Sequence, residues 1–372
     1  MEGPPTILDK SAFQALSYTE LAEFRKYFLE NVTPVLILEI LGDLKKQYRD
    51  GTVPEEKVTE LAGKFGFGEW LNEDRRFICE QTLLGTAIPL VGKVVPAYAT
   101  VVDGEEGSAA LIEDGPLNHL IRRLASRKAT EADRQLAARW RSASQSLSLT
   151  GLNEFVNHHQ ILVPRVRTPA EAVQAARGLV DTGALQKIWL AWLLDHLGVN
   201  ARTGSEIVVR WRARGGLLRS FAPYAHYCLH AQLSLFVAWR SNVVGWKPTN
   251  ILDLEYVYYL PFCSVFVSDD KLHRVLVPSL LRPDQLFVRM QDFKAGLRQT
   301  RKHFEDLPEG ERIELRKKLY NWPPEGSIIR ELWIKNERWV GPPPPPRGLK
   351  SRPVEPGSCT KASLTETASG HR

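Results

Sequence analysis

Apolar runs that end in an acidic residue lie near both ends of this sequence. Residues 6–9 are a short apolar run that ends in Asp9, and residues 265–270 are a second one, Val-Phe-Val-Ser-Asp-Asp. Short, apolar, β-branched runs are typical of strands buried in a parallel sheet. Open α/β sheets place their chemistry at the carboxyl ends of such strands. We therefore predict one sheet domain, built from both ends of the chain, with acids at its strand ends.

Apolar residues with helical spacing accompany these runs. The run at residues 33–38 suits a buried strand or a strand-to-helix entry, so we predict that Glu39 lies where a second strand hands over to a helix. Thr249 is a suitable cap for a helix that carries Asp253 and ends before Pro261. The other elements predicted for the two ends are helices at residues 11–16, 18–30 and 309–320, and strands at residues 265–267 and 285–288.

The middle of the chain has a different pattern, with helical periodicity and few strand-like runs. Helices are predicted at residues 131–142, 169–179, 184–197 and 224–239. With 372 residues, the chain is longer than one core usually organises. We predict the N-terminal half of a sheet domain at 1–50, a mostly helical insertion at 51–245, the C-terminal half of the sheet domain at 246–300, a helical extension at 301–340, and a Pro-rich disordered tail at 341–372.

Composition excludes several classes of protein and identifies none. A charged content of 25% and a hydrophobic content of 43% are those of an ordinary globular protein, and a net charge of +6 favours polyanionic partners only weakly. The four cysteines form no CxxC pair, which argues against a zinc site or a disulfide framework and favours the cytoplasm. We find no secretory signal or membrane-spanning run. Phosphate-loop, dinucleotide and nucleophile-elbow motifs are also absent from the sequence.

The residues around the acids resemble those of PIN-like nuclease domains. Residues 7–11, Ile-Leu-Asp-Lys-Ser, are similar to that family's opening strand, which ends in Asp before a small hydroxyl residue. Residues 35–41 are similar to its second strand–helix junction, which supplies a Glu, here Glu39. Asp253 occupies the place of the third acid. Residues 267–271, Val-Ser-Asp-Asp-Lys, are similar to the closing Ser/Thr-x-Asp motif, with Asp270 as the counterpart of its Asp.

The resemblance covers about the first 50 residues and residues 246–300, and it implies a three-layer α/β/α parallel sheet split by the helical insertion. The long gap between Glu39 and Asp253 departs from the compact family domain and requires that insertion. The implied activity is that of a divalent-metal-dependent nuclease, most simply an endoribonuclease, which hydrolyses phosphodiester bonds of RNA or another nucleic acid.

The resemblance also implies the residues of the site. Asp9, Glu39, Asp253 and Asp270 would bind Mg²⁺ or Mn²⁺, since hard cations select carboxylate oxygens. The remaining candidates are Asp269 and Glu255 as further ligands, Ser11 and Ser268 as residues that orient the acids, and Lys271, Arg210, Arg212 and Arg214 as contacts to substrate.

Each acid also has an ordinary interpretation. Asp9 and Asp270 would simply end strands, and Glu39 and Asp253 would be first-turn acids that the helix dipole favours. The chain would then be a non-enzymatic protein- or nucleic-acid-binding protein with a vestigial acidic site, and the helical insertion would hold the partner. A third alternative keeps the site and applies it to a nucleotide or another phosphate ester, as a phosphatase.

Overall fold

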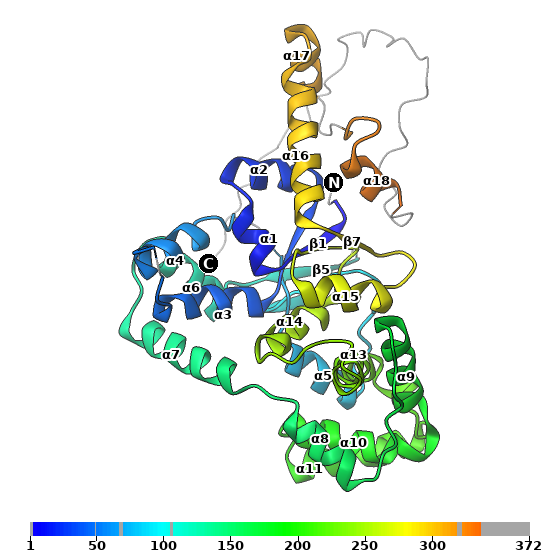
Figure 1. Ribbon diagram of the computed structural model, residues 1–372. Helices are drawn as coiled ribbons and strands as arrows, with labels where there is room; N and C mark the ends of the chain where they lie inside the picture. Colours follow the sequence, from blue (N-terminus) through cyan, green and yellow to red (C-terminus); the bar gives the residue numbers. More distant parts are fainter. Residues whose placement is uncertain (1–2, 49, 67–69, 105–106, 318–321, 336–372) are drawn as a thin grey trace, which may run out of the picture. The chain divides into compact units, whose positions relative to one another are not determined.

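A five-stranded parallel sheet is the core of the computed structural model (Figure 1), which describes residues 3–48, 50–66, 70–104, 107–317 and 322–335. The strand order is β3-β2-β1-β6-β7, and every neighbouring pair is parallel. The strands are β1 (Pro5–Leu8), β2 (Leu29–Val32), β3 (Trp70–Leu71), β6 (Val265–Val267) and β7 (Leu286–Val288). The α/β class and the parallel sheet predicted from the sequence are therefore confirmed.

The two central strands come from opposite ends of the sequence. Strand β1 pairs with β6 in the register Thr6↔Val265, Ile7↔Phe266 and Leu8↔Val267. From β1 the chain moves outward to β2 and β3, and it later returns on the other side of β1 as β6 and β7. The carboxyl ends of the two strands that flank such a reversal form the usual ligand crevice of parallel sheets. Asp9 and Ser268 follow these two strands directly.

The helices of the sheet domain begin at strong capping residues. Asp9 caps α1, Ser17 caps α2 and Asp270 caps α15, and each side chain accepts a hydrogen bond from a backbone N–H of the first turn. Two of the predicted site acids are therefore also helix caps. The helices are α1 (Lys10–Ala15), α2 (Tyr18–Tyr27), α3 (Pro34–Gly42), α14 (Thr249–Val257), α15 (Lys271–Leu280) and α16 (Met290–Glu305).

The hydrophobic core fixes the position of the central strands. Ile7, Val265, Phe266 and Val267 are completely buried. Around the sheet, α16 packs against α2, where Phe293 makes an edge contact with the Phe24 ring. Burial on this scale holds the carboxyl ends of β1 and β6 in a fixed place, because each apolar side chain contributes about 1.5–3 kcal/mol.

Two predictions near the second strand are correct only in part. The helix predicted at residues 18–30 ends at Tyr27, and β2 begins at Leu29. Residues Glu30 and Asn31 of β2 are buried but polar, so β2 lacks the apolar pattern of a buried strand. The run at residues 33–38 is helix rather than strand, because Pro34 starts α3 and the helix is buried on most of its sides. Glu39 therefore lies within α3 and not at a strand–helix junction.

The middle of the chain is mostly helical, and the helices predicted there are present with slightly different ends. Helix α13 packs against α9 and α5. The segment also provides β3, so the sheet takes one strand from within residues 51–245. Its elements are α4 (Pro54–Ala62), α5 (Arg75–Leu84), α6 (Pro116–Ala125), α7 (Glu131–Ser146), α8 (Thr150–His158), α9 (Pro169–Asp181), α10 (Gln186–His196), α11 (Ala201–Ala213), α12 (Leu218–Phe221), α13 (Pro223–Arg240) and the hairpin β4 (Ala99–Gly104) and β5 (Gly107–Ile112).

Two further helices follow the sheet, α17 (Glu309–Lys317) and α18 (Ile328–Ile334). Short 3₁₀ turns occur at Asp43–Lys45, Gly183–Leu185 and Leu260–Phe262. The predicted Pro-rich tail at 341–372 lies outside the described residues. Among the helices that are described, none combines the length and the hydropathy that crossing a bilayer requires.

The approach of β1 to the end of α2 depends on Gly3. A Cβ atom at this position would lie 1.8 Å from the Tyr27 carbonyl oxygen, a group of the backbone that has little freedom to move. We predict that Gly3→Ala lowers the free energy of unfolding by about 1–3 kcal/mol, measured by urea denaturation. Gly151→Ala is the matched control, because a Cβ atom there would have no neighbour within 4 Å. Equal stability of the two variants would contradict the prediction.

Candidate functional site

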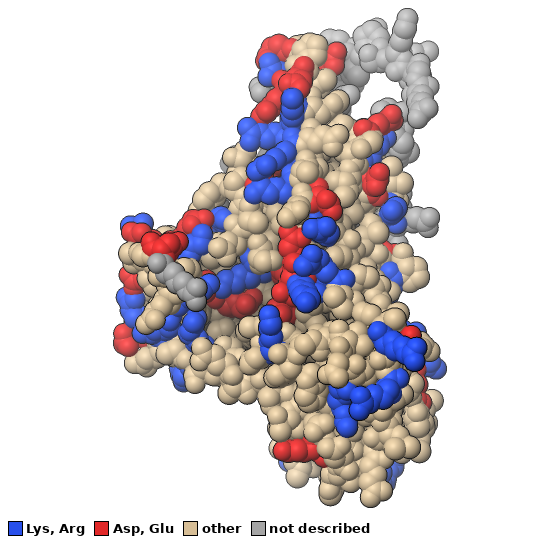
Figure 2. Space-filling view, viewed as in Figure 1, with Lys and Arg blue, Asp and Glu red and all other residues tan. Residues whose placement is uncertain are grey.

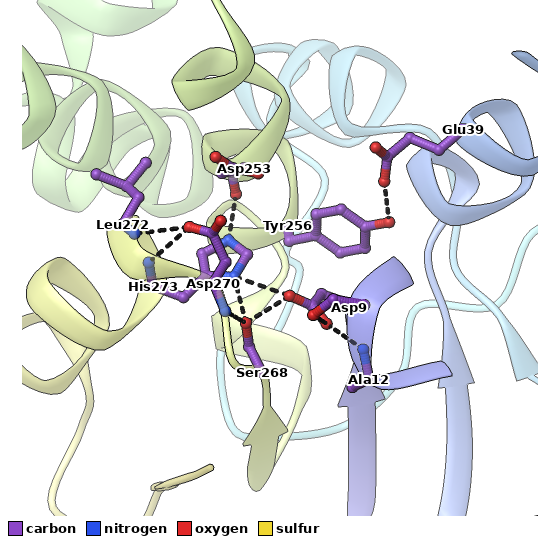
Figure 3. A network of polar contacts seen from close by, with 10 residues as sticks. Asp9, Ala12, Glu39, Asp253, Tyr256, Ser268, Asp270, Leu272 and His273 are labelled. Carbon is purple, nitrogen blue, oxygen red and sulfur yellow. Dashed lines mark hydrogen bonds and ion pairs between the residues drawn. The ribbon is translucent and has the colours of Figure 1, made fainter. Parts of the chain in front are cut away.

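Asp9 is the buried centre of a polar network at the carboxyl ends of β1 and β6 (Figure 3). Its residue surface is 3% exposed. Oδ1 accepts hydrogen bonds from the Ala12 N–H at 2.7 Å and from the Ser11 hydroxyl at 2.8 Å. Oδ2 accepts a short hydrogen bond from the Ser268 hydroxyl and faces His273 Nδ1 at 3.3 Å. Ser11 and Ser268 therefore both donate hydrogen bonds to Asp9.

His273 links this network to α14. Its side chain is 1% exposed, and its Nε2 lies 2.8 Å from the backbone carbonyl oxygen of Asp253. Its Nδ1 lies 2.8 Å from Ser268 Oγ. Ser268 Oγ also accepts a hydrogen bond from the Asp270 N–H at 2.9 Å. One imidazole thus joins the ends of β1 and β6 to the first turn of α15 and to α14.

The hydrogen-bond partners indicate that His273 carries a positive charge. A carbonyl oxygen has no proton to give, so Nε2 must be the donor to Asp253. Nδ1 faces the carboxylate of Asp9, and a lone pair at that position would be repelled by the carboxylate oxygen. An imidazolium satisfies both contacts, because both of its nitrogens donate. Asp9 and His273 therefore form a buried ion pair.

Electrostatics agree with this assignment. Burial alone would lower the pKa of His273, but the hydrogen bond to Asp9, the charge of Asp9 and that of Asp253 together raise the pKa to about 9. Burial alone would raise the pKa of Asp9, but the hydrogen bond and charge of His273 and the hydrogen bonds from Ser268 and Ala12 outweigh it, so that this pKa is lowered. Each member of the pair holds the other in its charged form.

Asp270 and Asp269 are adjacent but have different surroundings. Asp270 Oδ1 accepts hydrogen bonds from the N–H groups of Leu272 at 2.6 Å and His273 at 3.4 Å, and so caps α15. The Asp269 side chain is 32% exposed, and its Oδ1 lies 3.8 Å from Arg289 Nε. Asp270 thus binds the N-terminal N–H groups of α15 beside the site, and Asp269 faces the exposed Arg289.

The charged form of Asp253 is opposed by its surroundings. Burial raises its pKa to about 7, and the charges of Asp270, Glu39 and Asp9 raise it too, while the charge of His273 partly offsets them. Such mutual effects are expected of carboxylates that lie near one another in a poorly solvated place. Acids from four separate segments of the chain therefore surround one site.

Glu39 reaches the site from α3 and contacts α14. Its Oε2 accepts a short hydrogen bond from the Tyr256 hydroxyl, one turn after Asp253 (Figure 3). Burial raises the pKa of Glu39, and the nearby charge of Lys10 and the Tyr256 hydroxyl oppose this effect. The Lys10 ammonium donates to the Glu39 backbone oxygen at 3.1 Å and pairs with Asp43 at 2.8 Å. Lys10 thus brings a positive charge to the α3 side of the site.

The four acids have the right chemistry for a hard divalent cation, since carboxylate oxygens are the ligands that Mg²⁺ and Mn²⁺ prefer. Their oxygens are not gathered into a coordination shell. Within the described residues, no group of three or more His, Cys, Asp or Glu side chains is arranged to hold a metal ion. Both oxygens of Asp9 are already occupied by hydrogen-bond donors of the protein.

The other predicted contacts lie further from Asp9. Glu255 forms a bidentate ion pair with Arg75 of α5, at 3.0 and 3.2 Å. Lys271 is exposed at the first position of α15, next to Asp270. The predicted arginines belong to the helical segment. Arg210 donates to the Leu83 carbonyl oxygen at 3.4 Å, and Arg212 and Arg214 are exposed at the end of α11.

Three contributors to the site were not predicted as site residues. They are His273, Tyr256 and Lys10. His273 and Tyr256 each follow a predicted acid by three residues on a helix, which places them on nearly the same face as that acid. Lys10 follows Asp9 directly. Helical spacing was thus an available signal for two of them, although it does not by itself distinguish a site residue from a core residue.

Comparison of the chain with protein-family models, with curated proteins and with solved structures gives no significant match. The site is therefore interpreted from its own chemistry.

The charge of His273 makes stability depend on pH. Its pKa is about 9 in the folded protein, against an ordinary value of 6.5. The folded state therefore binds this proton more tightly, and the resulting stabilisation is complete below pH 6.5 and lost as the pH rises through 9. We predict that the stability difference between wild type and His273→Gln, on the order of 3 kcal/mol at pH 6, shrinks toward pH 9.5. Urea denaturation at a series of pH values measures it; a difference that stays constant with pH would refute the charged assignment.

Asp253 destabilises the fold in its charged form, whereas His273 stabilises it in its charged form. Its pKa of about 7 lies above the ordinary 3.8, so its ionisation costs stability as the pH rises, and the full cost is reached above pH 7. We predict that Asp253→Asn is more stable than wild type at pH 8 by about 2 kcal/mol, a value reduced for solvent screening, and equally stable near pH 4. Thermal melts at both pH values test this. The exposed control Asp195→Asn should show no such gain.

Proposed function

We propose that the chain is a divalent-metal-dependent nuclease with a PIN-like fold that acts on RNA. The observation that carries this proposal is the hydrogen-bonded network that holds Asp9, Asp270 and the backbone of Asp253 around His273, with Glu39 beside Tyr256 of the same helix as Asp253. Residues far apart in a sequence seldom bring like charges together at such a cost unless the charges serve a function.

The topology supports the same proposal. Counted along the chain, the five strands of the sheet have the order 3-2-1-4-5, and the acidic site lies where that order reverses. Asp9 follows the first strand, and the Ser268-x-Asp270 motif follows the fourth. Both positions agree with those that the PIN-like resemblance implies. Glu39 agrees in its order along the chain but lies deeper in its helix than the resemblance implies.

The proposed roles follow from the geometry. Asp9, Glu39, Asp253 and Asp270 would hold Mg²⁺ or Mn²⁺, which when bound supplies positive charge to a reacting phosphodiester and acidity to a water molecule. Ser268 and His273 orient Asp9, since both contact its Oδ2. Tyr256 orients Glu39. Asp9 and Glu39 are thereby each fixed by a neighbour before any ligand arrives.

A polyanionic substrate suits the surface beside the site. Lys271, Arg274 and Arg289 are exposed at the start of α15 and just before α16. In Figure 2, Lys and Arg side chains continue along α16, next to a smaller group of acidic side chains. Cations that flank an acidic site attract the phosphates of a nucleic acid, while the acids themselves repel them unless a cation is bound.

One observation favours the alternative of a non-enzymatic binding protein with a vestigial acidic site. Asp9 already has a buried cationic partner in His273, and donors of the protein occupy both of its oxygens. The positive charge of His273 would then balance the negative charge of Asp9, as a bound metal ion does in an active nuclease. The two functions differ in whether the acids are needed for cleavage or only for stability.

The decisive variant is Asp270→Asn. Asn caps a helix nearly as well as Asp, so α15 should remain intact while the negative charge is removed. We predict at least a hundredfold loss of Mg²⁺- or Mn²⁺-dependent cleavage of a labelled single-stranded RNA, because metal ions contribute several kcal/mol to such reactions. Asp9→Asn should lose activity as well, but it also leaves His273 without its counter-ion, so its folding must be checked by circular dichroism.

The exposed Asp195 provides the matched control, since Asp195→Asn removes one charge in the helical segment. It should cleave like wild type. If wild type cleaves neither RNA nor DNA with either metal ion, or if Asp270→Asn cleaves as fast as wild type, the nuclease proposal fails and the binding-protein alternative is favoured.

A further inference from the structure

A cavity lies beside the acidic site. Its wall includes residues of α3 and α14, the helices that carry Glu39 and Asp253. Its volume is about 260 Å³, and the residues that matter most among its lining are Leu38, Arg75, Arg76, Trp140, Leu252 and Tyr259. Helices α3, α5, α7 and α14 each contribute to its wall. Two of these four helices, α5 and α7, belong to the mostly helical middle segment.

The cavity and the acids share α3 and α14. Val35 lines the cavity, and Glu39 lies one helical turn later on the same face of α3. Leu252 lines it too, and Tyr256, the hydrogen-bond partner of Glu39, lies one turn later on α14. The cavity wall therefore adjoins the parts of α3 and α14 that carry Glu39 and Tyr256.

The walls combine apolar and aromatic surface with a few fixed polar groups. Trp140 is half-buried and supplies the aromatic ring of the wall that keeps exposed surface, whereas Tyr259 is 2% exposed and supports the wall from within the core. The Trp140 indole fits over α3 because residue 42 is glycine, where a Cβ would lie 2.9 Å from the ring. The Arg75 guanidinium is fixed by its bidentate pair with Glu255 and by the Tyr258 ring 4.5 Å away. Pockets of this composition bind small planar ligands, with the polar groups setting orientation.

The rim adds a cation. Arg76 is exposed and makes no ion pair with any described residue. It follows Arg75 at the start of α5, so a ligand in the cavity would find its phosphate beside Arg76 and its ring system between apolar walls. The volume lies just below the roughly 300 Å³ at which small-ligand pockets begin, which suits one ring system and excludes a helix or a strand of another protein.

We propose that this cavity binds one unpaired nucleobase of the nucleic-acid substrate, and that the helical middle segment exists in part to supply it. The proposal rests on the proposed nuclease function. A base can enter the cavity only when it is unstacked, so the substrate is single-stranded at the position next to the cleaved phosphodiester. Aromatic stacking accepts every base, so the subsite confers preference for single strands rather than for one sequence.

The test is a binding measurement that does not depend on cleavage. Fluorescence anisotropy compares a single-stranded RNA with an oligonucleotide of the same length that has abasic sites throughout, both bound to the non-cleaving Asp270→Asn protein. The normal RNA should bind about tenfold more tightly, which corresponds to about 1.4 kcal/mol. Trp140→Ala and Ala143→Phe, the second of which places a ring on the cavity wall at an exposed position, should each abolish that difference and leave abasic binding unchanged.

Matched controls separate the subsite from general effects on folding. Trp246→Ala removes a half-buried tryptophan outside the cavity, and Ala138→Phe adds a ring to an exposed position of α7 that does not line it. Both should retain the tenfold difference. Two results would overturn the subsite: equal binding of normal and abasic strands to Asp270→Asn protein, or pocket variants that keep the difference.

The outcomes also distinguish this proposal from the nuclease function. Base-dependent binding that the pocket variants remove, in a wild type that cleaves no nucleic acid, would support the subsite and refute the catalytic proposal. Cleavage by wild type with no base-dependent binding would do the reverse. Mononucleotides and inorganic phosphate are tested as competitors. If a mononucleotide competes as well as the RNA does, the cavity serves a free nucleotide, and the assignment to a polymer is overturned.

Discussion

The buried pair of Asp9 and His273 is the interaction on which the site depends. It joins the carboxyl ends of the two central strands to the start of α15, and through the Asp253 carbonyl group it reaches α14. Asp9 alone would be an uncompensated charge in a dry place, and so would His273. Together they form a rigid anchor, around which Ser268, Asp270 and Asp253 take fixed positions. The ion pair therefore sets the geometry of the acids whatever reaction they serve.

Compensation is uneven among the acids. Asp9 is paired with the positive charge of His273, and Glu39 has the Tyr256 hydroxyl as a donor and the charge of Lys10 nearby. The charge of Asp253 is opposed by the carboxylates around it and is only partly offset by His273. The negative charge of Asp9 is thus balanced by His273, whereas the negative charge on the α14 side of the site, at Asp253, is not balanced. A ligand with positive charge would find its most favourable position there, which is also the side nearest the cavity between α3 and α14.

The sequence predicted the sheet well where a strand is apolar and ends in a cap. Strand β6 was predicted with its observed bounds, and β1 nearly so, because Ile7, Val265 and Val267 are fully buried and an acid follows each strand. It failed at β2, where Glu30 and Asn31 are buried but polar, and the Asn31 amide donates to the Phe262 carbonyl oxygen of a distant segment. No local pattern contains that information.

The candidate acids could likewise be proposed from the sequence, but their compensation could not. His273 and Tyr256 look like ordinary core residues of amphipathic helices, and only the packing of α15 and α14 against β1 and α3 shows what their polar atoms contact. The cavity is a still clearer case. Its walls come from four helices that are distant in the sequence, and no motif marks any of them as a binding element.

The pairing of β1 with β6 also has a consequence for how the protein is made. Strand β1 emerges from the ribosome long before its partner, and Thr6 can meet Val265 only after the whole segment between them has been synthesised. Closing so long a loop is slow, and the intervening helices can form beforehand from local contacts. The acidic site therefore does not exist in a nascent or truncated chain. A molecule that carries it has been translated at least through β6 and α15, so whatever chemistry the site performs is withheld until that point of synthesis.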